Sequence, residues 1–455
     1  MNKINIQPQH LFLFLGLIYG LAFLLIVPPF GVPDEFEHFD RAYSLSDGQL
    51  MPVKIGNKAG IYVPVDVVKT REAIQKKWKF VALKKYKIDM HFLFKESSKN
   101  NDKKIFSDIS KIAVVTYSPI PYLMPAWGME FGKLFGLSPL VLMYIARFAN
   151  LVLWLFLIYL SIRITPVLKW GFLIVSLMPV TLFESASISA DCLTIGLSFV
   201  LIALLLRYSL NEKIRKINFK DIMILYLIIL ALSLTKIPYF LLIFLVFMIP
   251  PHKFGNNKKR IIIFASMLIT ALIIVLIWIL ITKGFYNPGR DVSIYNQLSF
   301  IIPHPIMFLK LIWDTLAINP LKMFIMVVGT QWFSYPLPRW IYIVNILILF
   351  LIPLIDKNGI RINFKNKSVI LGTFLMISGL IFLFEYLTWN PVAAVKITGV
   401  QGRYFIPVLP LLFLLSYNNK FKAKNNLLKL ISIVFIVLTL SIMLYFFVIS
   451  YYVSV

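Results

Sequence analysis

The sequence has little cysteine and few acidic side chains. Its single cysteine, Cys192, excludes a disulfide framework and any metal site built from several cysteines. Only 20 of the 455 residues are acidic, against 46 lysines and arginines, so the net charge is +26. A strongly basic protein often binds nucleic acid. No nucleic-acid motif is present here, and lysines in cytoplasmic loops together with one basic outer loop account for the charge, so we expect no nucleic-acid partner.

Apolar sequence is abundant. Hydrophobic residues make up 59% of the chain, whereas a soluble globular protein is about 45–50% apolar. Apolar runs of about twenty residues recur, and each is long enough to cross a hydrocarbon core of roughly 30 Å as a helix. The first run, from Leu11 to Val27, lacks a small-residue cleavage site and is interpreted as a retained span. The composition therefore predicts an all-α integral membrane protein.

We expect about eleven membrane spans, within a range of eleven to thirteen. They fall near residues 10–28, 139–162, 167–183, 186–207, 222–235, 237–251, 261–282, 340–355, 368–388, 403–417 and 427–449. With the N-terminus inside, four short loops rich in lysine or arginine lie on the cytoplasmic side, as the positive-inside rule requires. These loops are 207–221, 250–260, 356–367 and 418–426. Eleven spans then place the C-terminus outside.

The whole chain, 1–455, is predicted to form one transmembrane domain with two large outer loops. The first outer loop, 29–116, is basic, with lysines at positions that include 76, 77, 79, 84, 85 and 87. This charge is either a solvated face or an attraction for anionic headgroups, a lipid-linked phosphate or an acidic wall polymer. The second outer loop is 283–339. Apolar segments broken by Pro and Gly, 117–136 and 303–335, are expected to be in-plane or re-entrant helices, or an extra hairpin each.

The scarce acidic residues crowd just past the first span. The stretch VPPFGVPDEFEHFD (27–40) holds four of them within seven positions, after three prolines that end the helix. A partly desolvated carboxylate at Asp34 can act as a general base, with Glu35 or Glu37 assisting and His38 nearby. Two alternatives stay open: Asp34 caps a helix that begins near Glu35, or the carboxylates bind a divalent metal. We expect no metal or other cofactor, because no second cluster of ligands is visible.

Other ionisable residues occur near the outer ends of predicted spans. Glu184 and Asp191 flank a stretch of small residues, Lys236 interrupts LSLTKIPYF, and Arg403 and Tyr404 open another span. Each has an ordinary interpretation as a cap, a snorkelling lysine or an interfacial Arg–Tyr pair. Because all fall on one side of the predicted topology, we expect them to meet there, with Arg403 and Lys236 as phosphate ligands.

Six blocks of the sequence resemble, in order, an uncharacterised family of predicted bacterial multi-spanning membrane proteins. They are PDEFEHFDRAYSLSDGQL (33–50), YSPIPYLMPAWG (117–128), YIARFANLVLW (144–154), SISADCLTIGLS (187–198), LTKIPYF (234–240) and VQGRYFIPVLP (400–410). The resemblance covers roughly residues 25–415. That family in turn resembles the GT-C superfamily of membrane glycosyltransferases, which take sugars from polyprenyl-phosphate carriers. It implies location in the bacterial plasma membrane, with the active face outside and Asp34 as the general base in the first outer loop. It also implies in-plane helices in that loop, which segments 65–85 and 117–136 could supply.

These observations favour one hypothesis among three. The first is an inverting GT-C-type glycosyltransferase that uses a polyprenyl-phosphate sugar and an anionic cell-wall or cell-surface polymer, such as a teichoic acid or polysaccharide. Its predicted catalytic residues are Asp34, Glu35 and Glu37, and its predicted substrate-binding residues are His38, Asp191, Lys236, Arg403 and Tyr404. The second is a transporter or flippase of lipid-linked sugars, and the third is a non-catalytic scaffold of a wall-polymer assembly complex. In all three, membrane lipids surround the chain.

Overall fold

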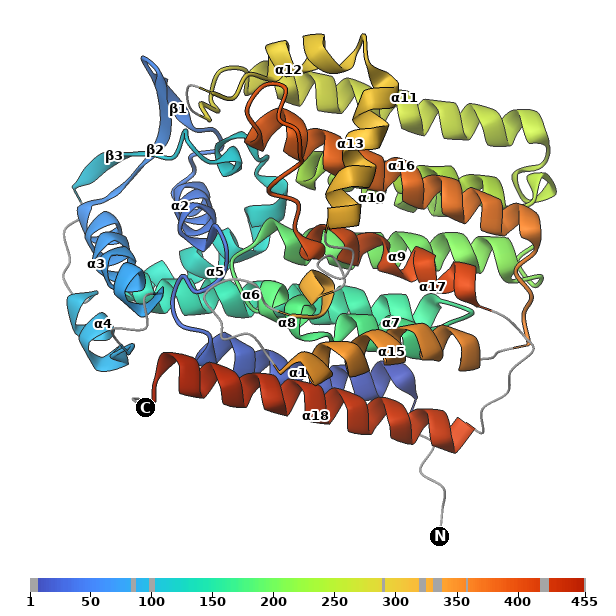
Figure 1. Cartoon of the computed structure of the whole chain (residues 1–455), viewed down its shortest axis with the longest axis horizontal. Helices are drawn as coiled ribbons and strands as arrows, with labels where there is room; N and C mark the ends of the chain where they lie inside the picture. Colours follow the sequence, from blue (N-terminus) through green and yellow to red (C-terminus); the bar gives the residue numbers. More distant parts are fainter. Residues whose placement is uncertain are drawn as a thin grey trace.

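Long helices lie side by side in the structure, with a small sheet and short helices gathered at one end (Figure 1). It is a computed structural model of the full chain. The described residues are 7–82, 87–97, 103–288, 291–318, 325–329, 338–356, 359–417 and 425–453. The predicted lysines 84 and 85 and parts of the segment 303–335 lie outside them.

Six helices in the described residues are long and apolar enough to cross a membrane. They are α1 (Pro8–Ile26), α6 (Pro139–Ile164), α9 (Ala190–Leu210), α11 (Asn257–Ile281), α16 (Phe364–Trp389) and most of α18 (Asn425–Tyr451). A seventh span is present only if α12 (Ile294–Ile301) and α13 (Pro305–Ile318), which meet at 106°, are counted together. The chain is therefore a mostly helical protein with several membrane-crossing helices.

The other five predicted spans are helical, but they are short or broken, so eleven complete spans stay a prediction. They correspond to α7 (Lys169–Ser176) with α8 (Pro179–Ser185), α10 (Phe219–Thr235), η3 (Ile237–Met248), α15 (Arg339–Ile355), and η5 (Gly402–Val408) with α17 (Leu409–Ser416). Proline explains two of the breaks. Met178, which precedes Pro179, is extended (ψ 145°), as a residue before proline usually is. Pro238 has no N–H to donate to the carbonyl four residues earlier, so α10 does not continue through it, and the chain is extended at Lys236.

Contacts between helix ends define two ends of the bundle. At the end that carries the sheet, Tyr452 donates a hydrogen bond to the Ile26 carbonyl (3.0 Å), and Arg147 of α6 donates to the Val27 carbonyl (2.8 Å). At the opposite end, the start of α16 meets the end of α17, where Lys367 binds the Tyr417 carbonyl (3.0 Å). We call the first of these the loop end, and all site residues described below lie there.

The segment predicted to be the first outer loop contains more than the helices that the sequence predicts. Its elements are α2 (Glu35–Ser46), β1 (Val53–Ile55), β2 (Lys58–Pro64), α3 (Val65–Ala82), α4 (Met90–Glu96), β3 (Lys104–Asp108) and η1 (Ala113–Thr116). The α3 helix matches the predicted helix at 65–85. The antiparallel sheet, in the order β1-β2-β3, was not predicted. A two-residue turn at Gly56 (φ 58°) and Asn57 joins β1 to β2, and the Gly60 backbone packs so closely on Ser107 that only glycine fits.

The loop end is completed by short helices that follow the sheet. The η2 helix (Ile120–Tyr122) continues into α5 (Leu123–Lys133). The remaining short helix, η4 (Pro251–Phe254), is not part of the loop end and lies at the opposite end of the bundle. With eleven residues, α5 is too short to be a span. This excludes a complete extra crossing at 117–136 and leaves the in-plane or re-entrant interpretation of that segment.

Candidate functional site

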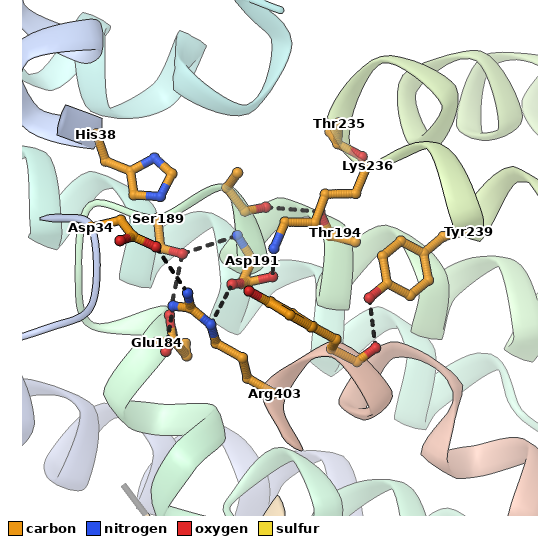
Figure 2. Close-up of polar contacts among 12 residues, drawn as sticks. Asp34, His38, Glu184, Ser189, Asp191, Thr194, Thr235, Lys236, Tyr239 and Arg403 are labelled. Carbon is orange, nitrogen blue, oxygen red and sulfur yellow. Dashed lines mark hydrogen bonds and ion pairs between the residues drawn. The ribbon is translucent and has the colours of Figure 1, made fainter. Parts of the chain in front are cut away.

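The site residues lie where helices are interrupted. Asp34 lies between the end of α1 and the start of α2 and has a left-handed backbone (φ 59°, ψ 12°). The predicted helix does begin at Glu35, but the Asp34 side chain makes no capping hydrogen bond. Its carboxylate turns instead toward Arg403, which explains why the capping interpretation is wrong for the side chain (Figure 2).

Arg403 is the centre of the site. Its two terminal nitrogens donate to Glu184 (3.0 Å) and to Asp34 (3.2 Å), and its Nε lies 3.7 Å from Asp191. Arg403 is 5% exposed and Glu184 2%, whereas the side chain of Asp34 is 37% exposed. Of the three carboxylates around the guanidinium, Asp34 is therefore the one that a solute can reach.

Lys236 adds a second cation from the break between α10 and η3. Its ammonium forms an ion pair with Asp191 and lies 5.0 Å from the centre of the Tyr404 ring. Arg403 lies 5.5 Å from the same ring, so Tyr404 contacts both cations. The Tyr404 carbonyl accepts a hydrogen bond from Tyr239 (2.6 Å), which ties η5 to η3.

Ser189 holds two of the acidic residues in place at the start of α9. Its hydroxyl accepts a hydrogen bond from the Asp191 amide (3.1 Å) and donates to Glu184 (3.3 Å) (Figure 2). We call the set Asp34, Glu184, Asp191, Lys236 and Arg403 the charged network. Its three acids and two bases come from four interruptions of the helical bundle, and the one between α8 and α9 supplies both Glu184 and Asp191.

Glu35 is placed differently from its neighbour. It is fully buried, and both of its oxygens accept hydrogen bonds from Arg147 (2.8 and 2.5 Å). Arg147 also donates to the carbonyls of Leu24, Val27 and Pro28 at the end of α1. This pair fastens α1 to α6, and a carboxylate so enclosed has no free face toward a substrate. Its geometry is that of a structural residue rather than the assisting base that the sequence led us to expect.

Glu37 and His38 lie on α2 beside the charged network. Burial raises the pKa of Glu37 to about 7, and the charges of Asp34 and Arg71 also reach it. Burial lowers the pKa of His38 to about 4, so the ring is neutral at neutral pH. The Nδ1 atom of His38 lies 2.6 Å from the Tyr122 hydroxyl. Both residues are thus near the site without belonging to its ion pairs.

One family model, described as a predicted membrane protein (DUF2142), matches residues 17–412 of the 455. The chain belongs to the DUF2142 family. The matched range contains the whole charged network. No match was found among the curated proteins or among the solved structures. The family description supports a membrane protein and is silent on its chemistry, so the resemblance to GT-C enzymes stays a prediction.

Three further residues of this DUF2142 chain interact with the site residues and were not singled out from the sequence. Arg147 pairs with Glu35, Tyr122 with His38, and the charges of Lys236 and Arg403 reach Glu385 on α16. Two of them carried a usable signal, because an ionisable residue within an apolar run is a candidate functional residue by default. Arg147 stands in YIARFANLVLW and Glu385 in FLFEYLTW.

The charged network is built from ion pairs. In the described part of the chain there is no group of three or more His, Cys, Asp or Glu side chains arranged to hold a metal ion. Asp191 and Glu184 each face a cation instead. Chemically, this arrangement offers a partly exposed carboxylate beside a buried guanidinium, a combination suited to exchanging one anion for another at the same cation.

Proposed function

We propose that the protein is a membrane glycosyltransferase that moves a sugar from a polyprenyl-phosphate donor to an anionic cell-surface polymer at the outer face of the membrane. The observation that carries the proposal is the pair formed by Arg403 and the partly exposed Asp34, at 3.2 Å. It puts a candidate base next to a candidate phosphate ligand, which a transfer from a sugar phosphate requires.

The donor phosphate first takes the place of the Asp34 carboxylate at Arg403. Arg403 is buried and keeps Glu184 as a partner, so the exchange leaves one anion on each side of the guanidinium. Lys236 supplies a second positive charge to the phosphate. The carboxylate of Asp34, released from its ion pair, is then free to accept a proton.

In the transfer step, an acceptor hydroxyl oxygen attacks the anomeric carbon of the donor sugar. The bond from that carbon to the phosphate oxygen breaks, and polyprenyl phosphate leaves with the electron pair. The proton of the hydroxyl passes to Asp34, and the anomeric configuration is inverted. Arg403 and Lys236 stabilise the negative charge that grows on the leaving phosphate.

The charge of the first outer loop supports an anionic acceptor. Exposed lysines cover the first outer loop, at positions 54, 58, 69, 76, 103, 104 and 111 among those whose side chains the structure describes. A basic surface of this kind attracts a phosphate-rich or carboxylate-rich polymer from solution. Teichoic acids and acidic polysaccharides have this chemistry.

A second candidate function is favoured by the breaks in the helices. The interruptions between α8 and α9, between α10 and η3, and before η5 adjoin the charged network. Transporters bind their substrates at discontinuous helices of this type. A flippase would move the intact lipid-linked sugar, whereas a transferase releases polyprenyl phosphate. A scaffold, the third hypothesis, would tolerate every single substitution in the charged network.

The experiment uses donor and acceptor from cells that lack the protein, because the sugar is unidentified. The lipid-linked sugar that accumulates in such cells is incubated with the purified protein in nanodiscs and with wall polymer from the same cells. We expect free polyprenyl phosphate and newly modified polymer. Movement of the lipid across a vesicle membrane with its sugar–phosphate bond intact would favour the flippase and contradict the transferase.

A further inference from the structure

The short helix α5 lies tightly against the outer part of α6. Gly128 and Gly132 of α5 are four residues apart, and a Cβ on either would meet α6: Ala149 at 3.0 Å for the first, and Leu142 at 2.5 Å for the second. Glycines at this spacing let two helices approach closely within membranes. Because the later glycine meets the earlier residue of α6, the two helices run antiparallel.

The α6 residues under α5 belong to a longer stripe. The stripe begins at Leu142 and Ile145, and Ile145 neighbours both glycines. At alternating spacings of three and four residues it continues with Ala149, Val152 and Phe156. The first three residues are covered by α5, whereas Val152 and Phe156 are 43% and 57% exposed. Since α6 is a membrane-crossing helix, the open part of the stripe faces lipid, and α5 covers its outer continuation.

The face of α5 that points away from α6 is apolar. Leu123 is 51% exposed, Trp127 64% and Phe131 54%, and Leu134, the residue after α5, is 77% exposed. Only its outer half carries charge, because Glu130 is exposed and Lys133 binds Asp47 (2.5 Å). A short helix with Trp, Phe and Leu on one face and charges toward one end is typical of a helix at a membrane interface.

The end of α18 marks the level of the membrane edge beside α5. The hydroxyl of Tyr452, one residue past α18, and the guanidinium of Arg147 both bind carbonyls at the end of α1. Arg147 is also level with the α5 contact, because Gly128 touches Ile145 and Ala149 on either side of it. Leu123 and Trp127 therefore fall on the membrane side of this level, and Glu130 falls at its outer side.

We propose that α5 is inserted obliquely into the outer leaflet, where Leu123 and Trp127 contact lipid acyl chains and Glu130 lies among the headgroups. The partner of this surface is the lipid itself. This placement sets the inner end of α5, where Tyr122 binds His38, at acyl-chain depth. The proposal does not depend on the proposed function.

The test uses single cysteines labelled with a small fluorophore in the full-length protein in nanodiscs. Cys192 is buried, so an introduced cysteine is the one that reacts. The variants are Leu123→Cys, Trp127→Cys and Glu130→Cys, with Val152→Cys as a lipid control and Asn57→Cys, in the exposed β1–β2 turn, as a water control. Quenching is measured with iodide in solution and with spin labels on lipid acyl chains.

Labels at positions 123 and 127 should be quenched by the acyl-chain spin labels as strongly as at position 152, and by iodide several-fold more weakly than at position 57. Position 130 should be intermediate for both quenchers. Strong iodide quenching at 123 and 127 would place α5 in water and overturn the proposal. Protection of both positions from both quenchers would mean that another protein covers this face, which also overturns it.

Discussion

The guanidinium of Arg403 lies 3.2 Å from the carboxylate of Asp34, although 369 positions separate the two residues in the chain. The contact brings the segment between α1 and α2 against the distant η5 helix. It also joins a buried cation to a partly exposed anion, and under the proposed function this is the pair that the donor phosphate separates.

Removal of the cation at the centre of the charged network should be costly. In Arg403→Gln, the buried Glu184 loses its charged partner, and such a loss typically costs about 3–5 kcal/mol. We expect a lower thermal unfolding midpoint in detergent. The double variant Glu184→Gln/Arg403→Gln should recover part of the loss, because it removes the unpaired charge as well. Equal stability of Arg403→Gln and the wild type would show that the ion pairs are not formed.

The Glu35–Arg147 pair should behave as a structural element. Arg147→Lys is expected to destabilise the fold by about 3 kcal/mol or more, because one ammonium cannot serve Glu35 and three carbonyls together. The matched control is Asp47→Asn, which breaks more exposed ion pairs with Lys104 and Lys133 and should cost only about 1 kcal/mol. Comparable stability of Arg147→Lys and this control would contradict the assignment.

The buried His38 should make the folded protein less stable as the pH falls. Burial lowers its pKa from 6.5 to about 4, so the folded state resists protonation more than the unfolded state does. The resulting stabilisation is complete above pH 6.5 and disappears as the pH falls toward 4, by up to about 3 kcal/mol. Unfolding midpoints measured from pH 4 to 8 should therefore fall more steeply in the wild type than in His38→Gln. Parallel curves would refute this.

Glu37 should have the opposite effect and make the folded protein less stable as the pH rises. Burial raises its pKa from 4.5 to about 7, so its protonated form stabilises the fold. This contribution is complete below pH 4.5 and is lost as the pH rises through 7, by no more than about 3 kcal/mol. Relative to Glu37→Gln, in which His38 is unchanged, the wild type should lose stability between pH 5 and 8. A constant difference between the two proteins across this range would count against the raised pKa of Glu37.

Much of this architecture could be predicted from the sequence, because its causes are local. Apolar runs and their lengths predicted helices at every expected span, and the prolines before Asp34 predicted the end of α1. The positive-inside rule placed Glu184, Asp191, Lys236 and Arg403 on one side, and in the structure they meet.

The remainder depended on tertiary contacts that no local pattern encodes. Glu35 and Asp34 are adjacent, yet one faces Arg147 and the other Arg403, since the left-handed backbone at Asp34 turns their side chains apart. The number of complete membrane crossings could not be predicted from the sequence either. The pairs α7 with α8 and η5 with α17 are apolar enough to resemble spans, but each pair is interrupted by a break. The three-stranded sheet was not predicted because its strands are short and their sequence pattern is weak.

The central claim is that Asp34 is the working carboxylate of the site, and release of polyprenyl phosphate by purified Asp34→Asn tests it most directly. The variant keeps the size of the side chain and leaves Glu184 and Asp191 as partners of Arg403. The account predicts that Asp34→Asn folds like the wild type, with an unchanged elution profile, and releases no polyprenyl phosphate, whereas Asp47→Asn retains full release. Wild-type release by folded Asp34→Asn would contradict it.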